Sequence, residues 1–319
     1  MAEHPADDGS GVDAADRVGT ANATFAATLV DQLARCGLTH AFVAPGSRST
    51  PIAVALADRT DLRVEMMLDE RSAAFAALGC ALQSRRPAIA VCTSGTAATH
   101  FHGAVAEAGI SRVPLIVCTA NRPPELWGVG APQTIDQTDL YGVSGATFHR
   151  SRPPDDTDPS EWRELANTVW AAALSPGPVQ LDCPFREPLW ANPESLPAPI
   201  PTPSPPDPPG ATADDVADVV ATITRRGAAC GVVVAGRGES DPQAIADVAD
   251  RRGWPVIADH RSGARTDGAL RRFDTILRDA DGVRAGIDHV RYFGETLSSE
   301  VLSLTVAAGA AGGGTVLRF

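Results

Sequence analysis

The chain has 319 residues, enough for about two α/β domains that each bury a core. Its 39 acidic and 27 basic side chains give a net charge of -12, which disfavours a nucleic-acid groove and a polybasic membrane anchor. All basic residues are arginine, which excludes chemistry that needs a lysine amine, such as a pyridoxal Schiff base. No apolar run approaches the length that spans a bilayer. We therefore expect a cytoplasmic protein with small-molecule partners, no nucleic acid and no transmembrane segment.

The cysteines form no C-x-x-C pair, and several lie in apolar runs such as AIAVCT and LIVCTA. This placement is typical of reduced core residues. His100 and His102 are two residues apart on an expected helix and point to different faces. We therefore predict neither a disulfide framework nor a metal site within this chain.

Residues 1–20 are acidic and lack an apolar stretch, so we expect a disordered start. From residue 21 to 191, an expected helix over 22–36 is followed by the apolar runs THAFVA, LRVEMML, PAIAVCT, VPLIVCT and PVQLDCP, with helical segments between them. Strands that alternate with helices indicate a parallel sheet with helices on both faces. This pattern predicts a first α/β domain of three layers.

Residues 192–210 are dense in proline and predict a linker in extended conformation. The alternation resumes over 211–319, with expected helices at 213–226, 241–252 and 269–279 and from about 295, and strands at CGVVVAG, WPVIAD, HVRYFG and TVLRF. This predicts a second parallel, Rossmann-like α/β domain. Its last strand ends at Phe319 without a closing helix, so we expect an incomplete domain cut from a longer protein.

Polar loops follow four of the predicted strands. They are APGSRSTP (44–51), LDERSAAF (68–75), TSGTAATH (93–100) and ANRPPELWGVGAPQTIDQ (120–137). Ligands of an open parallel sheet collect at the carboxyl ends of its strands. Each loop alone has a local explanation as a turn or a helix cap. Together, in this order, they predict one binding site.

The four loops resemble the pyrimidine-binding domain of thiamine-diphosphate enzymes. TSGT and the glutamate of DER are shared across those enzymes. PGSRS, and RPPEL followed by G-A-x-Q, are narrower signals, and they identify the chain as similar to the 2-succinyl-5-enolpyruvyl-6-hydroxy-3-cyclohexene-1-carboxylate synthases. The resemblance covers residues 20–190, and the second domain is similar to the central domain of that family in architecture. Pro132 departs from the asparagine expected before Gln133.

The resemblance implies a decarboxylating carboligase of menaquinone biosynthesis, which adds the succinic semialdehyde unit of 2-oxoglutarate to isochorismate. It implies thiamine diphosphate with Mg²⁺ or Mn²⁺ as cofactors. It also implies a homodimer or homotetramer with the active site at the subunit interface. The chain contains no G-D-G followed by an asparagine, the motif that holds the metal and the diphosphate in this family. We therefore expect those ligands outside this segment, and the 319 residues alone to be inactive.

Glu70 is the predicted catalytic residue. A carboxylate hydrogen-bonded to ring nitrogen N1′ promotes the imino form of the aminopyrimidine, which takes the proton from the thiazolium C2. A solvated acid in the first turn of a helix is the alternative for an isolated DER. We interpret Asp69 as the helix cap and Glu70 as the cofactor residue.

The other predicted site residues fall into two groups by resemblance. One group shapes the pyrimidine pocket, and it comprises Pro45, Gly46, Thr93, Ser94, Gly95 and Thr96. The other contacts the acidic substrates, since arginine forks meet carboxylates bidentately, and it comprises Ser47, Arg48, Arg122 and Gln133. The alternative for the arginines is a structural pair with Asp69, Glu107 or Glu125.

Two other functions stay open at this point. A nucleotide-binding oxidoreductase needs G-x-G-x-x-G, but Gly236 and Gly238 are followed by Asp241 where the third glycine belongs. A half-site or regulatory subunit of a split thiamine-diphosphate enzyme, such as an acetolactate-synthase-like protein, would lend Glu70 to a partner chain. A serine nucleophile is disfavoured, because TSGTA is not the G-x-S-x-G elbow.

Overall fold

The computed structural model describes residues 10–175, 177–204, 231–237, 241–270, 272–279, 289–293, 297, 302–303, 306–307 and 315–318. The chain divides into two compact units, 1–207 and 208–319. Each unit has a parallel sheet and helices, which confirms the predicted α/β class. No helix among these residues is both long and apolar enough to cross a membrane.

The first unit is built on a six-stranded sheet in the order β2-β1-β3-β4-β6-β5. All of its strand pairs are parallel. The chain moves from β1 outward to β2 and then returns across β1 to β3, so the direction of winding reverses between β1 and β3. The strands are β1 (His40–Val43), β2 (Arg63–Met66), β3 (Ala88–Cys92), β4 (Leu115–Asn121), β5 (Thr147–Arg150) and β6 (Val179–Pro184).

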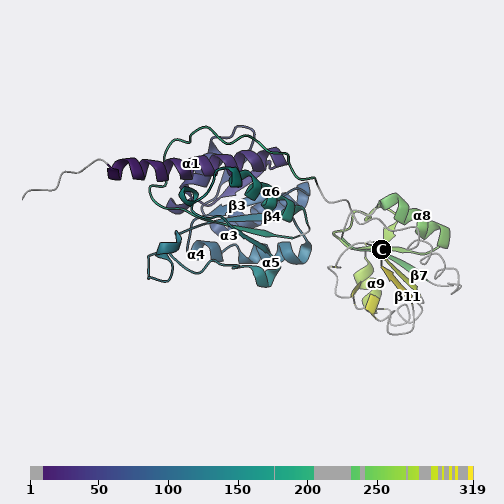
Figure 1. Ribbon diagram of the computed structural model, residues 1–319. Helices are drawn as coiled ribbons and strands as arrows, with labels where there is room; N and C mark the ends of the chain where they lie inside the picture. Colours follow the sequence, from purple (N-terminus) through teal and green to yellow (C-terminus); the bar gives the residue numbers. More distant parts are fainter. Residues whose placement is uncertain are drawn as a thin grey trace, which may run out of the picture. The chain divides into compact units, whose positions relative to one another are not determined.

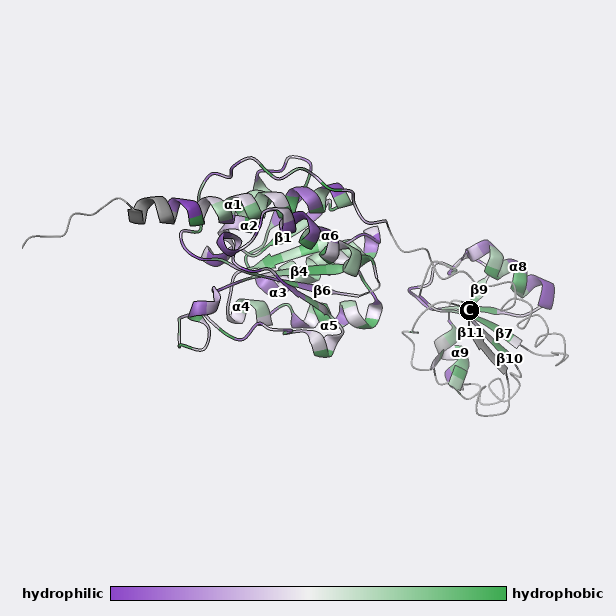
Figure 2. Ribbon diagram, in the orientation of Figure 1, coloured by the Kyte–Doolittle hydropathy of each residue, from purple (hydrophilic) through white to green (hydrophobic). Residues whose placement is uncertain are grey.

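Side chains of the central strands alternate between two cores, as the period of two along a strand requires. On β3, Ile89 and Val91 belong to one core, and Ala90 and Cys92 belong to the other. Helices α1, α2 and α6 cover the first core, and α3, α4 and α5 cover the second (Figure 1). Figure 2 shows the interior strand β4 as hydrophobic between these layers. The helices are α1 (Ser10–Cys36), α2 (Thr50–Ala57), α3 (Glu70–Ser84), α4 (Thr96–Thr99), α5 (His102–Ser111) and α6 (Ser160–Leu174).

Helix α1 begins at Ser10, so the prediction of a disordered start is wrong for residues 10–20; residues 1–9 lie outside the described part. The helix is held by a segment distant in the sequence. A Cβ built on Gly19 would lie 3.1 Å from Cγ of Pro188. Asn22 Nδ2 donates to the carbonyl oxygens of Arg186 and Pro188 at 2.8 and 3.0 Å. Composition alone does not reveal these contacts.

The first part of the predicted linker packs on the first unit. The backbone N–H of Glu194 donates to Thr24 Oγ1 at 2.9 Å, and Gln32 Nε2 donates to the carbonyl of Ile200 at 3.0 Å. Arg163 donates to the carbonyl of Pro197 at 2.8 and 2.9 Å. Extended proline-rich backbone leaves its carbonyls free for such donors. Residues 205–210 of the linker lie outside the described part.

The second unit has a parallel sheet in the order β11-β10-β7-β8-β9. Its strands are β7 (Gly231–Ala235), β8 (Val256–Ala258), β9 (Ala269–Leu270), β10 (His289–Phe293) and β11 (Thr315–Arg318). Helices α8 (Pro242–Arg252) and α9 (Phe273–Asp279) cover opposite faces (Figure 1). The helix expected over 269–279 begins only at Phe273, because β9 takes the first two positions to pair with β8.

Asp241 caps helix α8. Its side chain accepts a hydrogen bond from the backbone N–H of Gln243 at 2.9 Å. This is the position where a dinucleotide fingerprint needs a glycine, so the structure gives it a local role. Gly238, the helix expected at 213–226 and most of the helix expected from 295 lie outside the described residues.

Candidate active site

The loops that follow β1 and β3 meet at the point where the winding of the first sheet reverses, which is where ligands of such sheets bind. Gly46 follows β1 in extended conformation, with φ of -164°. A Cβ built on it would lie 2.5 Å from Cβ of Thr93, so no other residue fits without a shift. The predicted first and third loops are therefore in direct contact.

The third loop is held against the fourth. Gly95 has a φ of +78°, and a Cβ built on it would lie 2.8 Å from the carbonyl oxygen of Gln133. Gln133 Nε2 donates to the carbonyl of Ser94 at 3.1 Å. Gly95 N donates to Oε1 of the buried Gln137 at 2.8 Å. Glycine at position 95 thus serves both the left-handed backbone and the close approach.

Asp69 and Glu70 differ in their contacts at the start of α3. Asp69 is the N-cap and accepts from Ser72 N at 2.8 Å, as predicted. Glu70 is half-buried, and no hydrogen bond or ion pair joins its carboxylate to another described residue. Burial raises the pKa of the Cys92 thiol well above its usual value, and the negative charge of Glu70 adds to this effect. The uncommitted carboxylate therefore lies near the end of β3.

Two buried polar atoms at these loops lack a partner among the described residues. They are Oγ1 of Thr93 and Nε of Arg48. Buried polar groups in folded proteins are nearly always hydrogen-bonded, so an orphan needs an explanation. Both orphans lie where the predicted ligand-binding loops converge.

Arg48 is only 6% exposed and is anchored at one end of its guanidinium. Nη1 donates to the carbonyl of Phe185 at 2.8 Å, and Nη2 donates to Oε1 of Glu187 at 2.8 Å. The sequence left open that Arg48 forms an ion pair that only holds loops together. Arg48 does form an ion pair, but its partner is Glu187, which was not among the carboxylates expected. Burial lowers the pKa of Arg48, and the positive charge of Arg122 lowers it further, while Glu187 raises it.

Arg122 follows β4, and its guanidinium donates to the hydroxyl of Ser94. No carboxylate among the described residues forms an ion pair with it. Glu125, one of the partners considered from the sequence, is taken instead by Arg186 at 2.7 Å. Arg48 thus has one carboxylate partner, Glu187, and the positive charge of Arg122 acts on Arg48 across the site.

The remaining predicted residues lie at the rim. Pro45, Ser47 and Thr96 are exposed, next to Gly46 or at the starts of the short 3-10 helix over 47–49 and of α4. Pro132 is exposed, and its carbonyl accepts from Thr134 Oγ1 at 3.2 Å. The structure therefore brings residues of the four loops to one edge of the sheet, with these at its periphery.

Sequence reasoning missed a buried polar network behind this edge. It contains Thr119, Asn121, Gln137, Arg150 and Asp182, which link β4, β5, β6 and the fourth loop. The available signal was an aspartate inside the apolar run PVQLDCP, because a charge in a strand buried on both faces needs partners.

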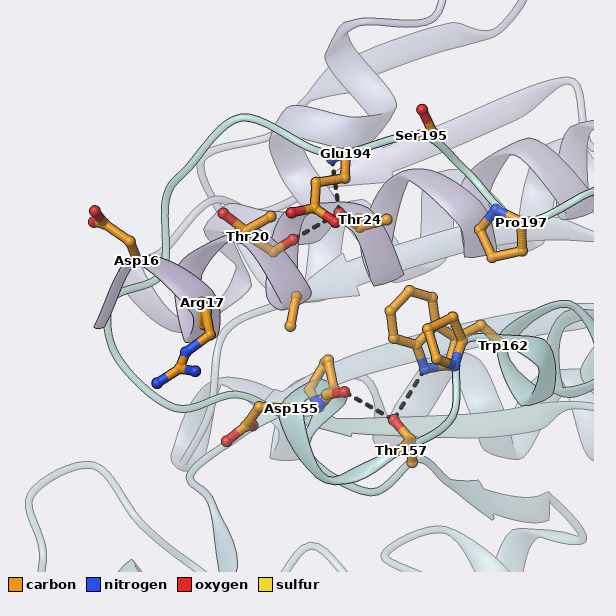
Figure 3. A pocket seen from close by; sticks show the side chains of 13 residues that line it. Asp16, Arg17, Thr20, Thr24, Asp155, Thr157, Trp162, Glu194, Ser195 and Pro197 are labelled. Carbon is orange, nitrogen blue, oxygen red and sulfur yellow. Dashed lines mark hydrogen bonds between the residues drawn. The ribbon is translucent and has the colours of Figure 1, made fainter. Parts of the chain in front are cut away.

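Cavities lie among the described residues of the first unit, and two of them are large enough for a small molecule. One of about 540 Å³ lies behind the fourth loop and is lined by members of the polar network, including Asn121 and Arg150. The other, of about 910 Å³, lies between α1, the start of α6 and residues 194–197 (Figure 3). None of the predicted site residues lines this larger cavity. Its Trp162 and Thr157 are hydrogen-bonded to each other, so they direct no free polar group into it.

His102 has a local role, since it lies 3.1 Å from Ser144 Oγ and packs edge-to-face on Tyr141. Within the part of the chain that the structure describes, no group of histidine, cysteine, aspartate and glutamate could hold a metal ion.

A family of known proteins matches the first unit. Residues 23–140 match the model of the thiamine pyrophosphate enzyme, N-terminal TPP binding domain. This range contains the four loops described above.

Curated relatives match across both units. A 2-succinyl-5-enolpyruvyl-6-hydroxy-3-cyclohexene-1-carboxylate synthase from Thermobifida fusca is 46% identical over 266 residues, which cover 82% of this chain and 48% of the relative. A synthase of the same name from Myxococcus xanthus is 40% identical over 290 residues, 83% of this chain and 48% of the relative. The chain thus spans about half the length of the curated relatives it matches.

Among solved structures, the benzoylformate decarboxylase of Polynucleobacter necessarius is similar with a TM-score of 0.67 and 19% sequence identity. The match covers 92% of this chain and 55% of that one. At this identity the similarity establishes the fold alone.

Proposed function

Because the chain belongs to the family of 2-succinyl-5-enolpyruvyl-6-hydroxy-3-cyclohexene-1-carboxylate synthases, we propose that it supplies the pyrimidine-binding part of an enzyme that joins 2-oxoglutarate to isochorismate with loss of carbon dioxide. The observation that carries this proposal is a carboxylate without a partner among the described residues, Glu70, at the same sheet edge as two arginines, Arg48 and Arg122. A free carboxylate suits the cofactor, and paired arginines suit substrates that are both dicarboxylic acids.

The residues after β1, β2 and β3 fit an aminopyrimidine ring. Gly46 and Gly95 allow the first, third and fourth loops to pack closely against one another, and the buried hydroxyl of Thr93 at this junction lacks a partner among the described residues. Glu70 adds a carboxylate near the end of β3. These features support Pro45, Gly46, Glu70 and 93–96 as the pyrimidine pocket.

The diphosphate and its Mg²⁺ or Mn²⁺ have no comparable fit in the described part of the chain, where no metal-binding group of side chains exists. We propose that they bind within the half of the relatives' length that this chain does not cover. We further propose a homodimer or homotetramer in the cytoplasm, in which the active site lies between subunits.

Glu70 would hold a proton at ring nitrogen N1′ and thereby make the neighbouring amino group a better base. Thiamine diphosphate, when bound, supplies the carbon nucleophile that releases carbon dioxide from a 2-oxoacid. A half-buried carboxylate is more effective in this role than a solvated one, because fewer water molecules screen its charge.

Arg48 and Arg122, with Ser47 and Gln133 at the rim, would bind and orient the substrate carboxylates. A guanidinium meets a carboxylate through two parallel hydrogen bonds, so each arginine fixes direction as well as charge. The unpaired Nε of Arg48 offers such a donor.

The test compares Glu70→Gln with Glu65→Gln in the full-length protein. Glu65 is a nearby carboxylate on β2 that pairs with Arg63 at 2.7 Å, so its variant controls for loss of charge close to the site. We expect Glu70→Gln to bind the cofactor but to slow exchange of its C2 proton by about a hundred- to ten-thousand-fold. Glu65→Gln should exchange as the wild type does. Quenched-flow NMR of thiamine C2 gives the rates, and equal rates in both variants would contradict the assignment of Glu70.

A further inference from the structure

A fully buried carboxylate, Asp182, lies near the carboxyl end of β6. Its Oδ1 accepts hydrogen bonds from Thr119 Oγ1 and Gln137 Nε2, both at 2.8 Å. Its Oδ2 accepts from Asn121 Nδ2 at 2.8 Å and from Arg150 Nε at 2.7 Å. Four donors satisfy the carboxylate, which is what a buried charge requires.

Two of the four donors reach the candidate site with their other end. The Oε1 of Gln137 accepts from the backbone N–H of Gly95 at 2.8 Å. The Oδ1 of Asn121 accepts from the backbone N–H of Arg122 at 2.8 Å. Asp182 is therefore one amide side chain away from each of the two loops that carry Arg122 and its partner Ser94.

Arg122 depends on this network at both of its ends. Its backbone is held by Asn121, and its carbonyl accepts from Trp127 Nε1 at 2.7 Å. Its guanidinium donates to Ser94, whose loop is held by Gln137 through Gly95. A long side chain that is fixed at both ends cannot move freely into solvent.

Such fixing is needed because Arg48 and Arg122 repel one another. Burial lowers the pKa of Arg48, and the charge of Arg122 lowers it further. Without restraint, Arg122 would gain both electrostatic energy and conformational entropy by turning away. A substrate would then have to pay for the ordering of the arginine when it binds.

We propose that Asp182 is a positioning residue for the acidic substrates: through Asn121 and Gln137 it holds Arg122 and the Ser94–Gly95 turn in the orientation in which the two arginines converge. This inference rests on the proposed function, in which Arg48 and Arg122 bind the substrate carboxylates. It assigns Asp182 no contact with substrate or cofactor.

Amide hydrogen exchange in the full-length protein tests the positioning directly, since Gly95 N–H and Arg122 N–H are the two bonds that Asp182 supports. Asp182→Asn keeps the shape of the side chain, but its new NH₂ group faces neighbours that are themselves donors. The backbone N–H groups of Gly95 and Arg122 should therefore exchange about tenfold faster. Asn121→Ala should affect Arg122 alone. Thr119→Val is the matched control, because it removes a bond of the same length to Asp182 without touching either loop.

Steady-state kinetics with the same variants tests the consequence. We expect Asp182→Asn and Asn121→Ala to raise KM for an acidic substrate by on the order of a hundred-fold, because small misplacements of binding groups have effects of this size. Cofactor affinity and the KM of Thr119→Val should stay within about threefold of the wild type, a change that corresponds to well under 1 kcal/mol.

Three results would overturn the proposal. Equal KM changes in Asn121→Ala and Thr119→Val would mean that the network acts only through stability. Faster exchange with unchanged KM would mean that the position of Arg122 does not matter, and unchanged exchange in Asn121→Ala would mean that the network does not hold it. If Asp182→Asn fails to fold, the comparison of Asn121→Ala with Thr119→Val still tests the proposal. Absence of turnover in the wild type would contradict the proposed function instead, while the exchange comparison would retain its meaning.

Discussion

The first unit contains two groups of arginines that are partnered in opposite ways. On the helical face, Asp31 of α1 accepts hydrogen bonds from Arg35, Arg59 and Arg163 at 2.7 to 2.8 Å. Arg59 has a second carboxylate, Asp61, at 2.6 Å. Arg163 of α6 and Arg59, just after α2, link these helices to α1, whereas Arg35 lies on α1 itself. Each of the three pairs with a carboxylate.

At the strand ends, Arg48 and Arg122 have fewer carboxylate partners. Arg48 has one carboxylate, Glu187, whose side chain is 71% exposed. Arg122 donates to a hydroxyl, and no described carboxylate pairs with it. Converging positive charges cost free energy in a half-buried place, and a bound anion removes that cost. The comparison teaches that the partners of an arginine, more than its burial, distinguish a structural role from a binding role.

The largest expected effect separates the two groups by activity. Arg122→Ala in the full-length protein should lower kcat/KM for the acidic substrates by a factor that corresponds to about 2 to 5 kcal/mol, the usual cost of removing one partner of a charge-assisted pair. Cofactor affinity and unfolding temperature should barely change, because the side chain makes few bonds within the protein. Kinetics for each substrate, beside a cofactor titration, provides the measurement.

Arg48→Ala sharpens this first prediction. It should lower kcat/KM similarly, but it should also lower stability, because Phe185 and Glu187 lose their partner. Unchanged KM and kcat in both arginine variants would mean that these side chains are structural, and the contrast with the Asp31 cluster would fail.

The second prediction concerns the Asp31 group, for which we expect a change in stability and none in substrate binding. Arg163→Ala should lower the free energy of unfolding by about 3 kcal/mol, because it uncouples a buried carboxylate and leaves the Pro197 carbonyl without donors. Arg35→Ala is the control, since Arg35 is half exposed and such pairs contribute about 1 kcal/mol or less. Denaturant unfolding measures both. Substrate KM should be unchanged. A rise in KM for Arg163→Ala would contradict the distinction between structural and substrate-binding arginines.

Part of this architecture was predictable from the sequence. Apolar runs predicted β1, β2, β3, β4 and β6, because each run is short and bounded by turns, whereas β5 was not predicted. The rule that ligands collect at the carboxyl ends of strands then predicted that the four loops form one site. Helix-cap chemistry predicted that Asp69, and not Glu70, caps α3.

The partners of the charged residues were not predictable. Arg48 pairs with Glu187, far along the chain, and Asp182 is surrounded by donors from three other segments. Helix α1 begins at Ser10, and residues 186–191 pack against it at Gly19 and Asn22. Pairings of this kind depend on how strands and loops are stacked in three dimensions, whereas sequence patterns report local periodicity.

The smallest expected effect concerns the pH dependence of the Asp31 cluster. Burial raises the pKa of Asp31, but hydrogen bonds from Arg35, Arg163 and Arg59 outweigh it and bring the pKa to about 2, from 3.8. A carboxyl whose pKa is lower in the folded state stabilises the fold above its unfolded pKa. That stability, on the order of 2 kcal/mol, should be lost as the pH falls from about 4 through about 2. Unfolding free energies of wild type and Asp31→Asn, measured between pH 2 and pH 7, should converge toward the acid end. A difference that stays constant across this range would show that Asp31 acts through packing, and that the cluster is not held by charge.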